Sequence, residues 1–336
     1  MIALLCLTAA KLYFIRLTLI TDSWNLIFVS SSPLVAKGLD LLLKIPFFSL
    51  LFIPWLFLYR RSLITQISLD LDFFDLKIAS YNYHQNFQFY HLLTSICATI
   101  CCVVPFIILI TMRGYEFWMN NFEVNTFIAY SWSGGLLFYT MFNLLLYFVL
   151  SRVKDINHIL RRMLNIENMD STKTETLQTI QMLSKLHDKL CDVTNNLSTC
   201  FAMPVVFIMV HICISQILAT FAFIRVCFYH HDPDEFKDSL FILTGTVCYS
   251  LLSIVSIGLA GEMKKCSVIT WKLIHRMINK TTSVEVEDRL QRLSEQMGHR
   301  VPHIDFRFFD VDWALFVKAC SESATYLIIL IQFDSK

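Results

Sequence analysis

Residues 308–333 form the last apolar stretch of the sequence. The polar residues within it are spaced so that they could act together in a functional site. Lys318, Glu322, Thr325, Ile329 and Gln332 follow one another at steps of 4, 3, 4 and 3, so a helix places them along one side. An ionisable side chain at the centre of a membrane helix costs about 2.5–3.5 kcal/mol, and such side chains usually face water or the interior of a bundle. The sequence therefore predicts a terminal helix that keeps this side away from lipid.

Other clusters of reactive residue types give no support for a metal site or a catalytic site. Residues 229–232 contain two adjacent histidines, which rarely reach one metal ion, and Pro302 interrupts the set His299, His303 and Asp305. The sequence holds no nucleophile and base motif, no paired-carboxylate signature and no cofactor loop. We therefore expect neither an enzyme nor a cofactor or metal site.

The composition indicates a membrane protein. Of 336 residues, 55% are hydrophobic and 16% are charged, whereas an ordinary soluble domain has roughly 45–50% apolar and about 25% charged residues. The net charge of +1 and the lack of a phosphate loop or a basic, aromatic stripe argue against a nucleic-acid partner. We expect a multi-pass protein of the plasma membrane, surrounded by membrane lipid.

Seven apolar stretches are long enough to cross a hydrocarbon core about 30 Å thick, which takes about 20 helical residues. They are residues 2–28, 41–59, 92–112, 124–150, 197–228, 239–260 and 308–333. The sequence therefore predicts an all-α fold, a seven-transmembrane helix bundle.

Basic residues are divided unequally between the connections of this bundle. The connections 60–91, 151–196 and 261–307 hold 19 Lys and Arg, and the three on the other side hold 3. By the positive-inside rule the first set is cytoplasmic, which predicts a cytoplasmic N-terminus and an extracellular C-terminus. This polarity argues against a G-protein-coupled receptor, whose N-terminus lies outside.

Two of the cytoplasmic connections carry amphipathic helical patterns. Residues 151–165 continue the fourth span, and the capping-box patterns Thr172-x-x-Glu175 and Thr282-x-x-Glu285 each open a further helix. The stripe of the first of these helices comprises Leu177, Ile180, Leu183, Leu186, Leu190 and Val193. A solvated helix hairpin is one interpretation. The other is that the two apolar stripes pack against each other and against other subunits.

The end of the chain resembles a known receptor family. Residues 325–333 read TYLIILIQF, which resembles the TYhhhhhQF signature, with h hydrophobic, that closes the seventh helix of insect gustatory receptors. Upstream, Phe309, Asp312, Leu315 and Phe316 resemble the family's aromatic, acidic and paired hydrophobic residues, while Arg307 replaces its usual Gly. Compared with the family, we expect this chain to lack the usual cytoplasmic N-terminal leader.

The resemblance implies a taste-ligand-gated, non-selective cation channel, assembled as a homo- or heterotetramer with gustatory receptor subunits. Four terminal helices would line the pore, with Gln332, Phe333, Ile329, Thr325 and Glu322 as pore and gate residues, and Phe333 would close it by excluding water. The implied organisation is spans one to four, a cytoplasmic helical extension, spans five and six, a cytoplasmic helical anchor and the pore-lining terminal helix. Their residues are 1–150, 151–196, 197–260, 261–307 and 308–336.

The resemblance also implies a pocket for a small-molecule tastant in the outer half of spans two to six. Aromatic and polar residues there are the ligand-binding candidates: Phe127, Tyr130, Trp132, His211, Gln216, Thr220, Thr244 and Tyr249. Each of them has a second interpretation as an interfacial anchor or an interhelical hydrogen-bond partner.

The sequence leaves two other functions open. An odorant receptor of the same superfamily shares the architecture, although the TY and QF ends of the motif favour taste. A secondary transporter would have repeated halves with Gly- or Pro-broken helices, and Pro105 and Pro204 do not occupy matching positions.

Overall fold

The computed structural model describes residues 37–38, 52–79, 122–165, 173–228, 233–306 and 311–334, and scattered positions between 96 and 119. The six long elements are helices: α4 (Arg61–Ala79), α7 (Phe122–Asn165), α8 (Lys173–Phe228), α9 (Pro233–Ile278), α10 (Val284–His299) and α11 (Trp313–Asp334). The predicted all-helical class is confirmed. The predicted spans 2–28, 41–59 and 92–112 lie largely outside the described residues.

Four of the described helices are long and apolar enough to cross a membrane. They cover Trp132–Asn165, Lys173–Phe228, Pro233–Ile278 and Trp313–Asp334. The predicted fourth to seventh spans fall on these helices in order.

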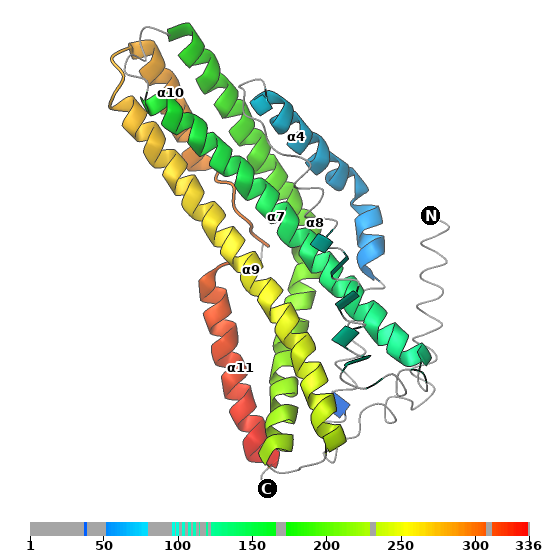
Figure 1. The fold of residues 1–336 in the computed structure, drawn as a ribbon. Coiled ribbons are helices and arrows are strands. Elements are labelled where there is room, and N and C mark those ends of the chain that lie inside the picture. Colours follow the sequence, from blue (N-terminus) through cyan, green and yellow to red (C-terminus); the bar gives the residue numbers. More distant parts are fainter. Residues whose placement is uncertain are drawn as a thin grey trace.

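The three longest helices continue well past their apolar parts. α7 has 44 residues, α8 has 56 and α9 has 46, so residues 151–165 extend α7 as predicted, and the helix expected after Thr172 forms one piece with the fifth span. Figure 1 shows α10 and α4 beside one end of these helices and α11 along the other half. We call residues 151–165, 173–196, 261–278 and α10 the extension layer.

The start of α10 corrects one prediction. Its N-cap is Ser283 and not Thr282, and the Ser283 side chain makes no capping hydrogen bond. The first intrahelical bond runs from the Glu287 N–H to the Ser283 carbonyl at 3.0 Å, which sets the cap one residue later.

The apolar stripe of α8 is buried inside this chain. Leu186 and Leu190 are both 1% exposed, and they share one core with Leu290 and Leu293 of α10. The expected packing of the two stripes against each other is confirmed. Contact of this layer with other subunits stays a prediction, and the buried residues of the stripe are covered by the chain's own helices.

Helix α4 was not predicted, because residues 60–91 were interpreted only as a connection. Its buried residues Ile67, Leu71, Phe74 and Ile78 recur at helical spacing, a signal present in the sequence. The helix packs against α8, and Lys189 Nζ lies 2.9 Å from the Asp70 carboxylate.

A buried ion pair joins α4 to α7. Arg152 Nη2 lies 2.5 Å from Asp75 Oδ2, and the two side chains are 9% and 7% exposed. Arg152 also donates to the Phe148 carbonyl at 2.8 Å. Burial removes the hydration of both charges, so each one needs the other as its partner.

Two asparagines of α7 hold it against α9, which lies beside it in Figure 1. Asn143 Nδ2 donates to the Leu252 carbonyl at 3.0 Å, and its Oδ1 accepts from Ser256 Oγ at 2.5 Å. One layer further, Asn157 Nδ2 donates to the Cys266 carbonyl at 3.0 Å, and its Oδ1 accepts from Thr270 Oγ1 at 2.7 Å. Both amides bond residues 109 and 113 positions ahead, so α7 and α9 run parallel in one fixed register.

Candidate pore helix and ligand cavities

Helix α11 begins with a carboxylate cap. Asp312 Oδ1 accepts the backbone N–H of Leu315 at 3.0 Å, and a negative group is favourable at a helix N-terminus. The sequence interpretation had placed Asp312 within the apolar span. The structure instead places it before the helix, where it satisfies the backbone.

The two sides of α11 have different surroundings. The half-buried residues Phe316, Ala319, Ser323 and Leu327 recur every three or four positions, and α11 packs against α8 and α9. No residue of this helix is buried in the chain. All members of the polar stripe are exposed: Lys318, Glu322, Thr325, Ile329 and Gln332.

Phe333 projects from the end of this helix with 74% of its side chain exposed. Next to it, Asp334 Oδ2 accepts from Arg225 Nε of α8 at 2.8 Å, and Arg225 Nη1 lies 3.7 Å from Glu235 of α9. The Arg225 side chain is only 13% exposed, and it joins the ends of three helices beside Phe333.

A cavity of about 590 Å³ lies between α8, α9 and α11. Its lining is mostly apolar, with polar groups from Gln216, Thr220, Ser250 and Glu322. Ser250 Oγ donates to Gln216 Oε1 at 3.3 Å, and Gln216 Nε2 donates to Thr220 Oγ1 at 3.5 Å. Two of the eight predicted ligand candidates, Gln216 and Thr220, therefore line one cavity that also borders α11.

Trp132 and Tyr249 take part in packing between α7 and α9. The Trp132 ring stacks on Phe241 with centroids 4.7 Å apart, and a Cβ at Gly245 would lie 2.3 Å from the indole. Tyr249 OH donates to the Trp132 carbonyl at 3.0 Å, and a Cβ at Gly135 would lie 2.2 Å from that oxygen. Neither aromatic residue lines the α8–α9–α11 cavity.

The remaining candidates have local partners or fall outside the described side chains. His211 lies 3.3–3.5 Å from Ser215 Oγ on the same helix, and Thr244 Oγ1 donates to a carbonyl one turn back at 2.8 Å. The side chains of Phe127 and Tyr130 are outside the described set. A role for these four residues in ligand binding stays a prediction.

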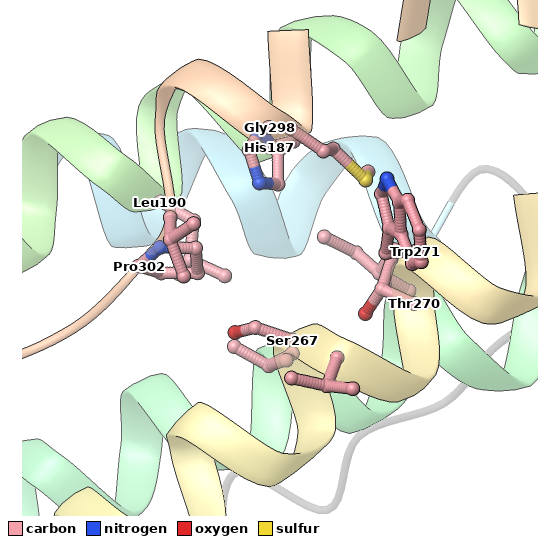
Figure 2. A pocket seen from close by; sticks show the side chains of 12 residues that line it. His187, Leu190, Ser267, Thr270, Trp271, Gly298 and Pro302 are labelled. Atoms are coloured by element: carbon pink, nitrogen blue, oxygen red, sulfur yellow. The ribbon is translucent and has the colours of Figure 1, made fainter. Parts of the chain in front are cut away.

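A second cavity, of about 350 Å³, lies in the extension layer between α7, α8, α9 and the end of α10 (Figure 2). Its walls are almost entirely apolar, and Figure 2 shows the His187 imidazole among them, with Trp271 on one side and Pro302 on the other. Burial lowers the pKa of His187 to about 4, which keeps the ring neutral.

A third cavity, of about 580 Å³, has a mixed polar and apolar lining and gathers His299, His303 and Asp305 with Arg60 and Arg300. Both arginines bond to other groups of the chain: Arg60 to the Thr199 carbonyl and Arg300 to Asp188 and Asp192. Within the described part of the chain, no group of three or more His, Cys, Asp or Glu is placed to hold a metal ion.

Comparison with protein families gives a match along nearly the whole chain. The family described as 7tm chemosensory receptor matches residues 2–336. Two Drosophila melanogaster proteins, named gustatory receptors 28a and 28b, are 27% identical over 158 residues and 38% identical over 88 residues. These matches cover 46% and 25% of this chain, but only 35% and 18% of the relatives.

Comparison with solved structures supports the same architecture. The insect olfactory receptor OR5 from Machilis hrabei has a TM-score of 0.60 at 14% identity, covering 98% of this chain and 88% of the receptor. The same receptor in complex with eugenol has a TM-score of 0.54 with the same coverage and identity. At this identity the likeness establishes the fold alone.

Proposed function

Because the chain belongs to the 7tm chemosensory receptor family, we propose that it is a tastant-gated, non-selective cation channel whose pore is lined by α11. The family consists of multi-pass membrane receptors and is not an enzyme family, in agreement with the sequence interpretation. The proposal adds to this the ligand class, the ion path and the assembly.

The observation that carries the proposal is the exposed polar side of α11. Lys318 and Glu322 lie within a membrane-crossing helix and are exposed in the single chain, and Glu322 also lines the α8–α9–α11 cavity. Charged side chains cost several kcal/mol in lipid, so this side needs water or other protein. A ring of chains that surrounds a water-filled axis with four copies of α11 satisfies that need.

The gate in this proposal lies at the end of α11. Four exposed Phe333 rings around a narrow axis would exclude water, and ions do not cross a dewetted constriction cheaply. Gln332 would line the open pore with an amide that replaces part of the hydration of an ion. The Arg225–Asp334 bond would tie this end of α11 to α8.

Taste is favoured over smell by the relatives in sequence. The curated proteins that match are named gustatory receptors, and residues 325–333 end in the TY and QF pairs. The olfactory receptor OR5 resembles this chain in fold only. We place a tastant in the α8–α9–α11 cavity, because a ligand there would contact both Gln216 and α11.

The test of this function is a calcium response to a panel of tastants in cells that express the chain. We expect the variants Gln216→Leu and Ser253→Leu to lower the potency of an active tastant at least about tenfold. The first removes a hydrogen-bonding amide from the cavity, and the second takes up space in it. Gln181→Leu, an exposed glutamine of the same helix outside the cavity, should leave the potency unchanged. If all three variants keep the potency of wild type at matched surface expression, the tastant does not bind in this cavity.

A further inference from the structure

The extension-layer cavity has the size and the walls of a small-molecule site, separate from the α8–α9–α11 cavity. It measures about 350 Å³, and an apolar cavity of about 150 Å³ is enough to bind benzene. Trp271 and Val268 are 45% and 49% exposed and mark its mouth, while Leu190 and Ile156 are buried behind them. A compact organic molecule of roughly twice the volume of benzene would fill it.

The hydroxyl groups in the wall of the cavity are already used as donors. Ser267 Oγ donates to the Met263 carbonyl at 2.9 Å, and Thr270 Oγ1 donates to Asn157 at 2.7 Å. A bound water needs two to four polar partners, which such walls do not offer.

Unlike these two hydroxyl groups, the imidazole of His187 has no close hydrogen-bond partner among the described residues. It is 4% exposed, and its nearest polar partner is Cys191 Sγ at 3.8–3.9 Å. Burial raises the pKa of the Cys191 thiol to about 12, so the thiol keeps its proton and donates it to the Arg300 carbonyl at 3.5 Å. The sulfur lies at nearly the same distance from both ring nitrogens of His187, so it is a weak partner for either one.

A neutral imidazole has one donor nitrogen and one acceptor nitrogen. Among the described residues the ring of His187 has no hydrogen-bond partner besides this distant thiol, which cannot serve both nitrogens well, and the remaining surroundings are apolar walls (Figure 2). A buried ring nitrogen whose partner is no better than a distant thiol costs free energy that a ligand hydroxyl would restore.

We propose that the extension-layer cavity binds a compact apolar alcohol or phenol whose hydroxyl donates to His187. Hydrophobic contact with Trp271, Val268 and Leu190 holds the body of the molecule, and the imidazole selects molecules that carry a donor. The site lies in a different layer from the cavity assigned to the tastant, so it does not depend on the proposed function.

The test uses the full-length protein in lipid nanodiscs, with 5-fluorotryptophan at its tryptophan positions and 1-naphthol as the probe. The fluorine resonance of Trp271, identified by its loss in Trp271→Phe, should shift saturably with 1-naphthol. Naphthalene has the same ring system without the hydroxyl, and we expect it to bind about tenfold more weakly, the effect of one hydrogen bond.

His187→Leu should reduce 1-naphthol to the affinity of naphthalene and leave naphthalene unchanged, which also shows that the variant is folded. His158→Leu replaces an exposed histidine of the same layer outside the cavity and should bind both probes as wild type. If His187→Leu does not fold, His187→Phe takes its place.

Three results would overturn the proposal. An unmoved Trp271 resonance at saturating 1-naphthol would show that the cavity takes no such molecule. Equal affinity of 1-naphthol and naphthalene in wild type would remove the hydrogen bond to His187. If His158→Leu and His187→Leu lose the same amount of affinity for 1-naphthol, the loss is a general effect of removing a histidine.

Discussion

Asn157 fixes the register of α7 on α9 within the extension layer, and replacing it with alanine tests that role. Its amide makes two bonds across the interface, to the Cys266 carbonyl at 3.0 Å and from Thr270 Oγ1 at 2.7 Å. Asn157 is 5% exposed, so water cannot replace these bonds without a rearrangement.

The magnitude follows from what Asn157→Ala leaves behind. Each hydrogen bond contributes about 0.5–1.5 kcal/mol net. The Thr270 hydroxyl also lies 2.9 Å from the Cys266 carbonyl, so the two groups satisfy each other when the amide is gone and no orphan penalty is added. We therefore expect a loss of about 2 kcal/mol, which lowers the melting temperature by several degrees.

The assay is thermal unfolding of the detergent-solubilised protein, followed by the loss of its monodisperse peak in size exclusion. Asn195→Ala, an exposed asparagine of the same layer, is the matched control and should melt with wild type. A double-mutant cycle with Thr270→Val should show a coupling of at least about 0.5 kcal/mol. If the Asn157 and Asn195 variants have the same melting temperature, Asn157 does not stabilise the contact between α7 and α9.

Three further predictions concern acid sensitivity, an ion pair and topology. His187 has a pKa lowered to about 4 from an ordinary 6.5, so the stability present above pH 6.5 falls by about 3 kcal/mol as the pH approaches 4, and His187→Leu should flatten that part of a melting-against-pH profile. Arg152→Met leaves Asp75 buried and unpaired and should cost about 3–5 kcal/mol, while adding Asp75→Leu should restore much of the melting temperature; no recovery would show that the loss does not come from the unpaired Asp75 carboxylate. Antibody on intact cells should stain a C-terminal tag and reach an N-terminal tag only after permeabilisation, and the reverse pattern would contradict the channel assignment.

Periodicity within one segment predicted much of the architecture. The fourth to seventh spans and the continuation of α7 through residues 151–165 follow from runs of apolar residues and from 3.6-residue spacing. The stripe that begins at Lys318 was also visible, because a helix needs only its own sequence to set which residues share a side.

The partners across helices could not be predicted in the same way. The bonds of Asn143 and Asn157 reach residues more than 100 positions away, and nothing near either asparagine marks the partner. Arg225 likewise meets Asp334, more than 100 positions away, only in the folded bundle. The cavities arise where α10 and α11 meet the long helices, which depends on packing distances that no local pattern contains.

In the proposed channel Phe333 is the barrier of the closed pore, and its truncation tests that role most directly. Whole-cell current without tastant, at matched surface expression, should rise in Phe333→Ala above wild type, because smaller side chains admit water to the constriction. Phe228→Ala is the control, since Phe228 is 75% exposed at the end of α8 and Phe333 is 74% exposed at the end of α11. We expect Phe228→Ala to stay silent without tastant. A Phe333→Ala channel that is silent without tastant and opens normally with it would contradict the assignment of this end of α11 as the gate.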